Sequence, residues 1–306
     1  NNTFLITSIQ KLQNGDDMDI MNELMNLSDK LSLATDQLGA NPNMAKLLEV
    51  ICTNLDKLYL PEIIIYSLQC INYILDVNPR LTNVLKRINA VPKIATIING
   101  LEDITCLDSI VTVFEKISYN NSVLLLENNI FLSLLNIIDF LGSSQRKSIM
   151  KCCLNISINV ISFQQFDNYI KPAYDILCLL TKYNDNDMKS TESAIAIFYN
   201  LILAMKDCTY NEDKIYSSDD LDELLTGNCV MENLCEILNK YFIERDKNVN
   251  CELVKKILLI ISNSCDISIK LVDKLFQIHF LPILSEVIHY EFNSTEMNLS
   301  TNMSGN

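Results

Sequence analysis

Eleven cysteines and two histidines are the residues of this 306-residue chain best suited to nucleophilic or metal chemistry. A reactive thiol or a zinc site needs cysteines and histidines that are grouped together. None of the cysteines forms a C-x-x-C pair, most lie among Leu and Ile at helical spacing, and their number is odd. Free cysteine behaves as a small hydrophobic residue when buried. We therefore predict reduced core thiols, with no metal site and no disulfide framework.

No other constellation indicates catalysis. The chain contains neither G-x-G-x-x-G nor G-x-x-x-x-G-K-[ST], so it has no motif for binding a nucleotide cofactor. His279 and His289 stand in apolar helical context, and acidic pairs such as Asp16-Asp17 suit the first turn of a helix. We predict no catalytic residue and no cofactor. The net charge of −14 also argues against nucleic acid as a partner, because phosphate backbones are bound mainly by Lys and Arg.

Polar side chains that recur within apolar runs are the remaining candidates, and their chemistry is peptide recognition. A side-chain amide both donates and accepts hydrogen bonds, so a ladder of amides can hold the backbone of an extended peptide. Arg146, Lys147 and Lys151 add a basic strip, which we interpret either as a solvated helix face or as a docking point for a carboxylate-bearing partner. We expect the long helices to line a groove that binds such a peptide. The candidate groove residues are Tyr73, Lys116, Lys151, Asn155, Asn200 and Asn263.

The elements that must position these residues are helices. Only 6 Gly and 6 Pro are present, too few for the turns of an all-β protein, and apolar residues make up 49% of the chain. We predict an all-α fold, a right-handed α-solenoid of about six armadillo/HEAT-like repeats. Segments that open a helix recur at AVPKI 90–94, NIFL 129–132, KPAY 171–174, CVM 229–231 and FLPI 280–283. Long helices are expected near residues 18–34, 61–76, 103–118, 144–160, 187–206 and 250–265.

The repeat domain is expected to cover residues 16–290, between flexible Asn/Ser-rich ends at 1–15 and 291–306. An acidic insertion at 206–217 is either a mobile loop that recognises a basic partner or a solvated connection. Apolar runs fall short of the roughly 18–20 residues that span a bilayer, and no signal peptide is visible, so we expect no membrane contact and a location in the cytoplasm or nucleus. The absence of an initiator Met indicates a fragment, expected to be monomeric.

Several stretches resemble one family. The phrase INYILDVNPR at 71–80 followed by AVP at 90–92, NELMNLSDKLS at 22–32, Gln145-Arg146 with Cys152-Cys153, and KSTES at 189–193 are similar to the armadillo-like region of the ubiquitin-fusion-degradation (KAKTUS-like) subfamily of HECT-type E3 ubiquitin ligases. The resemblance implies a non-catalytic scaffold that engages protein substrates or degradation signals and ubiquitin. It also implies that the catalytic Cys of the ligase lies outside this chain.

One alternative stays open, a free-standing adaptor or transport receptor of the importin or catenin kind. Importin-type arrays place a Trp four residues before each groove Asn, and this chain contains no Trp. The corresponding positions hold Gln69, Thr112, Lys151, Ala196 and Leu259. Aromatic stacking on a Lys/Arg-rich peptide would therefore be missing, which favours the ligase scaffold over the receptor.

Overall fold

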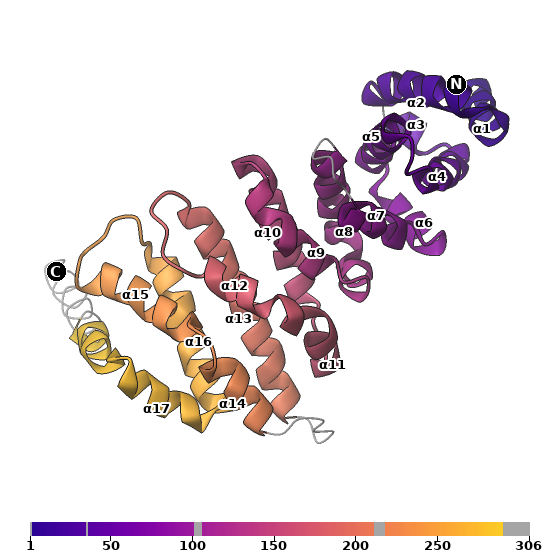
Figure 1. The fold of residues 1–306 in the computed structure, drawn as a ribbon. Helices are drawn as coiled ribbons and strands as arrows, with labels where there is room; N and C mark the ends of the chain where they lie inside the picture. The colour runs from indigo at the N-terminus through magenta and orange to yellow at the C-terminus, as the bar shows by residue number, and fades with distance from the viewer. Residues whose placement is uncertain (1, 35, 101–105, 211–217, 290–306) are drawn as a thin grey trace, which may run out of the picture. The chain divides into compact units, whose positions relative to one another are not determined.

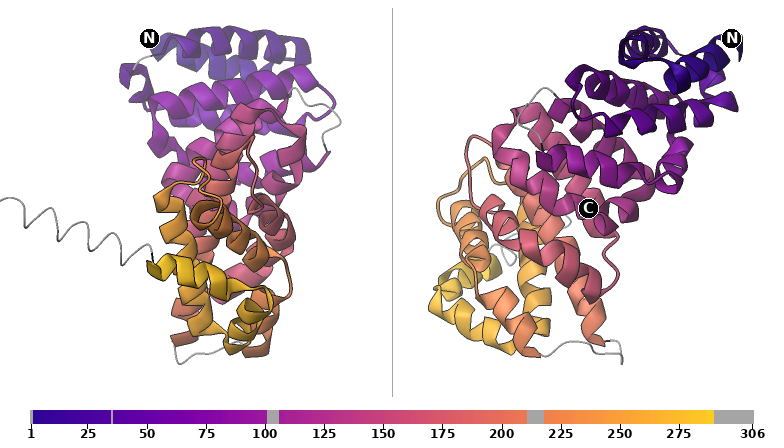
Figure 2. Two further views of the ribbon diagram at one scale, coloured as in Figure 1. Left: turned by 90° about the vertical axis from the view of Figure 1, so that its left-hand side faces the viewer. Right: turned by 45° about the vertical axis from the view of Figure 1, so that its right-hand side comes forward.

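The computed structural model describes residues 2–34, 36–100, 106–210 and 218–289, and all regular elements in these ranges are helices (Figure 1). The prediction of an all-α protein is therefore confirmed. The chain divides into two compact units, Asn1–Asn159 and Val160–Asn306, which we describe separately. Two further views of the ribbon show the helices of each unit (Figure 2). A single repeat domain over residues 16–290 stays a prediction.

The first unit is a stack of helices, and its long helices begin and end within two residues of the predicted ones, except for α8. Four of them, α2, α5, α8 and α10, pack against one another in chain order. The shorter helices α6, α7 and α9 lie against this row. The helices are α1 (Asn2–Asn14), α2 (Asp17–Ser32), α3 (Asp36–Gly39), α4 (Asn43–Thr53), η1 (Asn54–Asp56), α5 (Pro61–Val77), η2 (Pro79–Leu81), α6 (Thr82–Arg87), α7 (Ala90–Gly100), α8 (Leu107–Glu127), α9 (Ile130–Ile137), η4 (Ile138–Phe140) and α10 (Ser143–Ile158).

Helix α5 shows how local sequence sets an element. Pro61 occupies its first turn, where the missing N–H has no intrahelical partner in any case. Its Ile-rich face is buried, and each such side chain contributes about 1.5–3 kcal/mol on leaving water. The helix stops at Asn78, which stands before Pro79 and donates its amide to the Gly39 carbonyl at 2.9 Å.

The N-terminal segment is ordered, which corrects the expectation of a flexible end at residues 1–15. Residues 2–14 form α1, which packs on α2 and α4. Leu5, Ile9 and Leu12 are buried, and their spacing places them on one face of the helix. The Asn-rich composition concealed this apolar stripe. The other expected flexible end, 291–306, lies outside the described residues.

Helix α8 runs nine residues beyond its predicted end because two helices join across a kink. Asn121 has non-helical dihedral angles, φ −154° and ψ 58°, within the span Leu107–Glu127. In the part of the chain that the structure describes, no single helix is long and apolar enough to cross a membrane. One pair, Leu107–Glu127 with Ile130–Phe140, passes that test by length and composition only when it is taken together across a 105° bend.

The second unit contains the two remaining predicted long helices, α13 and α16, packed together. Acidic residues near the predicted insertion are partly structural, since Asp222 lies buried on α14, while residues 211–217 lie outside the described part. The helices are α11 (Phe163–Gln165), η5 (Phe166–Ile170), η6 (Lys171–Ala173), α12 (Tyr174–Leu180), α13 (Met188–Tyr210), α14 (Ser218–Thr226), α15 (Val230–Phe242), α16 (Cys251–Ile267), α17 (Ile269–Gln277) and a last helix, Phe280–His289.

Three residues with left-handed backbone occupy the same place in three of the repeats. Asn89 (φ 56°), Asn129 (φ 57°) and His279 (φ 58°) each stand directly before a helix, at Ala90, Ile130 and Phe280. Asn and His are among the non-glycine residues that most often adopt this conformation. Three of the five recurring helix-opening segments, AVPKI 90–94, NIFL 129–132 and FLPI 280–283, therefore coincide with a left-handed backbone turn.

Candidate functional site

The residues suited to nucleophilic chemistry lie mostly in the core, as predicted for the cysteines. Seven thiols are buried: Cys52, Cys70, Cys106, Cys152, Cys153, Cys178 and Cys235. Burial raises the pKa of Cys52 and of Cys70 to about 12, so both are neutral thiols at physiological pH. His279 is the turn residue described above. Among the described residues, no group of three or more His, Cys, Asp or Glu is arranged to hold a metal ion.

Lys116, a predicted groove residue, is held by the neighbouring helix. Its ammonium donates to the Asn72 carbonyl on α5 at 3.0 Å and pairs with Asp76 at 2.9 Å. Only 23% of the Lys116 side chain is exposed. Tyr73, the adjacent candidate on α5, is half-buried. The α5 end of the predicted groove is therefore occupied by contacts between the repeats.

Lys151 is more accessible. Its side chain is 56% exposed, its Nζ lies 3.4 Å from a Glu115 oxygen, and it stands over the Tyr119 ring at 5.0 Å from the centroid. The Tyr119 hydroxyl and the Glu115 carboxylate raise the pKa of Lys151 above its usual value, so this residue is a permanent cation. The position that holds Trp in importin-type arrays thus presents a positive charge beside an aromatic ring.

Asn155, the candidate on α10, forms part of a regular ladder to α8. Its Nδ2 donates to the Ser118 hydroxyl at 2.9 Å, and one turn later Asn159 Nδ2 donates to the Ser122 hydroxyl at 2.6 Å. Each pair joins residues 37 positions apart in the sequence. Asn residues four apart on α10 therefore face Ser residues four apart on α8, because residues i and i+4 share a helix face.

A polar pocket opens beside this ladder, with a volume of about 360 Å³. We call it the α8–α10 pocket. None of its residues is charged, and Tyr119 and Ile158 at its edge are 53% and 63% exposed. The kink at Asn121 separates the two parts of α8 that line it. The lining residues are Ser118, Tyr119, Asn120, Asn121, Ser122, Val123, Asn155, Ile158 and Asn159.

Of the residues that line this pocket, only Asn155 was predicted from the sequence. A signal was present, since the Ser118/Ser122 pair and the Asn155/Asn159 pair share a four-residue spacing, but Ser122 lies beyond the predicted end of its helix at residue 118. The search for an Asn ladder considered one residue per repeat and therefore passed over Asn159.

A larger concavity of about 810 Å³ lies among α1, α4 and η1 and is lined by three lysines. Each lysine already faces a carboxylate: Lys46 lies 3.3 Å from Glu49, Lys93 lies 2.6 Å from Asp56, and Lys57 pairs with Asp17. The charges are internally matched, so we do not favour this concavity as a binding site.

The candidates of the second unit are also engaged in contacts. Asn263 on α16 accepts from Lys206 Nζ at 2.8 Å and donates to the Leu259 carbonyl at 2.9 Å. Lys206 in turn pairs with Asp266 at 2.6 Å. Asn200 lies half-buried on α13. A peptide-binding role for these residues stays a prediction.

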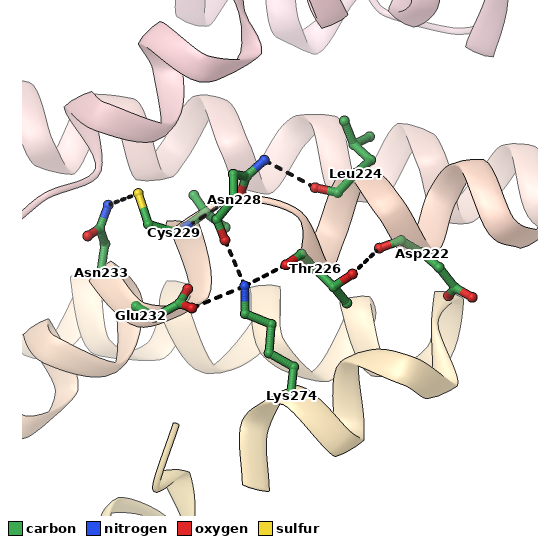
Figure 3. A network of polar contacts seen from close by, with 9 residues as sticks. Asp222, Leu224, Thr226, Asn228, Cys229, Glu232, Asn233 and Lys274 are labelled. Atoms are coloured by element: carbon green, nitrogen blue, oxygen red, sulfur yellow. Dashed lines mark hydrogen bonds and ion pairs between the residues drawn. The ribbon is translucent and has the colours of Figure 1, made fainter. Parts of the chain in front are cut away.

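A partly buried lysine joins the helices at the end of the second unit (Figure 3). Lys274 on α17 donates to the Thr226 and Asn228 carbonyls at 2.7 Å each and pairs with Glu232 at 3.1 Å. These carbonyls lie at the C-terminus of α14, where a cation is favoured by the helix dipole. The Lys274 side chain is 14% exposed, so we assign it a structural role.

Comparison with solved structures identifies the architecture. A designed armadillo repeat protein superposes with a TM-score of 0.60 at 18% identity, over 85% of this chain and 99% of that one. A second designed armadillo repeat protein, solved in complex with the peptide (KR)4, gives 0.59 at 18% identity over the same shares. An engineered protein gives 0.59 at 12% identity, over 86% and 97%. No protein-family model and no curated protein matches this sequence. The likeness shows the fold, which is an all-α solenoid of the armadillo type.

Proposed function

We propose that this chain is a peptide-binding repeat scaffold and that the α8–α10 pocket is part of its binding surface. The observation that carries the proposal is the ladder at Asn155 and Asn159, which lines an open polar pocket beside the exposed ring of Tyr119. Amides can meet a peptide backbone, and an exposed aromatic side chain can pack on peptide side chains. A designed protein of similar fold was solved in complex with the peptide (KR)4.

The energetics of the pocket suit such a ligand. Ser118 and Ser122 fix the amides through hydrogen bonds to the neighbouring helix, so the pocket is preformed. A preformed surface loses little side-chain freedom on binding, which is a cost of about 0.5–1.5 kcal/mol for each side chain that must be immobilised. Exposed Tyr119 and Ile158 supply apolar area that a ligand can bury.

Selection of peptides tests the proposal. A library of random 12-residue peptides displayed on phage is selected against the purified chain, and the Kd values of consensus peptides are measured by fluorescence anisotropy. We expect binders whose affinity falls at least about tenfold with Asn155→Ala and with Tyr119→Ala, since each change removes a polar or aromatic anchor. The matched control is Asn83→Ala, which removes an exposed amide on α6, away from the pocket. Failure to select peptides, or binders that tolerate both pocket variants, would sink the proposal.

The family resemblance suggests a finer proposal: the scaffold is the substrate- and ubiquitin-engaging region of a HECT-type ligase that acts in ubiquitin-dependent degradation in the cytoplasm or nucleus. Lys116 and Lys151 are its candidate contacts. A pull-down of a ubiquitinated substrate by the chain, repeated with Lys116→Glu and Lys151→Glu, tests it. Unchanged capture by both variants would contradict their role. An open reading frame without a HECT module downstream would instead favour the free-standing adaptor or transport receptor.

A further inference from the structure

The amide of Asn159 is unusual in the pocket because the protein itself uses both of its hydrogens. Nδ2 donates to the Ser122 hydroxyl at 2.6 Å and to the Asn155 carbonyl at 3.1 Å. A side-chain NH₂ group has two hydrogens, so it has no further donor to offer. The carbonyl oxygen Oδ1 is the atom that Asn159 can present to a ligand.

The orientation of this amide follows from its partners. The Asn155 main-chain oxygen can only accept a hydrogen bond, so the nitrogen of the Asn159 amide must face it, and the flipped arrangement would set two acceptors against each other. The same reasoning fixes Asn155. The Ser118 hydroxyl donates to the Glu115 carbonyl at 2.6 Å, so it accepts from Asn155 Nδ2.

Asn155 differs from Asn159 in which hydrogen-bonding atoms of its side-chain amide have no partner within the protein. It uses one hydrogen on Ser118, and its second hydrogen and its Oδ1 have no partner among the described residues. Asn155 can therefore donate to a peptide carbonyl and accept from a peptide N–H at once. Asn159, one helical turn away, can only accept.

We infer that Asn159 is a specificity-determining residue that selects peptides with an uncharged hydrogen-bond donor side chain, Asn, Gln, Ser or Thr, beside the backbone segment held at Asn155. The inference rests on the proposed function. An aliphatic side chain at this point would leave Oδ1 without a partner on desolvation, and a carboxylate would place acceptor against acceptor.

A cationic side chain is disfavoured for a separate reason. None of the nine residues that line the pocket is charged, so a Lys or Arg would lose water without gaining a carboxylate. The nearby Glu115 carboxylate is already paired with Lys151 and accepts a hydrogen bond from Tyr119, so it is not free for a peptide cation. The selected peptides should therefore differ from the (KR)4 ligand of the designed armadillo protein.

The experiment uses the consensus peptides of the phage selection described above. At one position we expect Asn, Gln, Ser or Thr, and its replacement by the apolar near-isostere, Thr by Val or Asn by Leu, should weaken binding to the wild-type chain about five- to tenfold. Replacement by Asp should weaken it further. With Asn159→Leu, the affinity difference between the Asn and Leu peptides should vanish.

A second variant separates selectivity from stability. Ser122→Ala removes one acceptor and releases a hydrogen of Asn159 Nδ2, so the variant should discriminate against the Asp peptide about fivefold less than wild type does. Ser133→Ala is the matched control, since this buried serine donates to the Asn129 carbonyl away from the pocket. It should keep wild-type discrimination.

The outcomes are distinct. Peptides that need Asn155 but show no donor preference, or a preference unchanged by Ser122→Ala and Asn159→Leu, would overturn this inference and leave the proposed function standing. Absence of peptide binders would overturn both.

Discussion

The ammonium of Lys116 on α8 donates to the backbone carbonyl of Asn72 on α5 at 3.0 Å. The Asn72 side chain in turn donates a hydrogen bond from Nδ2 to the Ser109 carbonyl on α8, also at 3.0 Å. Two adjacent repeats are thus joined by a reciprocal pair of polar contacts. Lys116 therefore supports the stacking of repeats through partly buried contacts, whereas the ion pair of Lys151 with Glu115 involves an exposed lysine side chain.

This difference predicts unequal stabilities. Lys116→Met should lower the free energy of unfolding by about 1–2 kcal/mol, because it removes a partly buried hydrogen bond to a main-chain oxygen. Lys151→Met should change it by less than about 0.5 kcal/mol, since its ion pair is exposed. Urea denaturation followed by circular dichroism measures both. Equal losses would show that the two lysines play the same part.

Helix α1 predicts a second outcome. Leu5→Ala should destabilise the chain by about 2–5 kcal/mol, because Leu5 is fully buried and its truncation leaves a cavity. Gln10→Ala on the exposed side of the same helix is the control and should be near neutral. Urea denaturation again gives the values. If the N-terminal segment were flexible, the two variants would behave alike.

Asp222 predicts a dependence on pH. Burial raises the pKa of this carboxyl, but the Ser268 hydrogen bond and the Lys270 ion pair together lower it below its ordinary 3.8. The folded protein thus holds the carboxylate more tightly than the unfolded chain does. The resulting stability is present above pH 3.8 and is lost as the pH falls through the lower, folded pKa.

Asp222→Asn should therefore destabilise the chain at neutral pH, and its difference from wild type should shrink as the pH falls below about 4. Urea denaturation at a series of pH values measures this. Asp219→Asn provides the comparison, since that carboxylate pairs with the same lysine but is 81% exposed. A constant difference between Asp222→Asn and wild type across the series would contradict the assignment.

Lys274 predicts a structural loss at the end of the second unit. Lys274→Met should cost about 1–3 kcal/mol, because the Thr226 and Asn228 carbonyls lose a charged donor and Glu232 loses its partner. Lys247→Met, at an exposed position, is the matched control. If thermal unfolding gave equal midpoints for both variants, the contacts of Lys274 drawn in Figure 3 would not stabilise this unit.

The burial of the cysteines predicts the order of their alkylation. Under native conditions N-ethylmaleimide should label the exposed Cys229 and Cys251 first. Cys52 and Cys70 should be protected, because they are buried and their pKa values are raised to about 12. Mass spectrometry of the digested protein measures the labelling rate at each site. Rapid labelling of Cys52 or Cys70 in the folded chain would contradict their place in the core.

Much of the fold could be predicted from the periodic spacing of apolar residues and from the residues that mark helix boundaries. The long helices α5 and α10 fall within two residues of their predicted ends, because Pro61, Asn78-Pro79 and Ser143 mark helix boundaries through local stereochemistry. Local rules did not reveal the kink at Asn121, which joins two helices into α8. Helix α1 was missed because its polar composition concealed three buried apolar residues.

The site was less predictable than the fold. Asn155 was found because one conspicuous position recurs in each repeat. The hydrogen bonds from Asn155 to Ser118 and from Asn159 to Ser122 depend on how α8 and α10 are aligned against each other. No local sequence pattern predicts that alignment. The contacts of Lys116 with the neighbouring helix were likewise not visible in the sequence, and its role in ligand binding stays a prediction.

The left-handed turns at Asn89, Asn129 and His279 have a consequence for recognising the repeats of this chain. Few residue types tolerate this backbone conformation, yet an amide fills it twice and an imidazole once. A comparison of amino-acid letters therefore separates His279 from the two asparagines, although all three stand directly before a helix. A comparison of backbone handedness would place the three turns together.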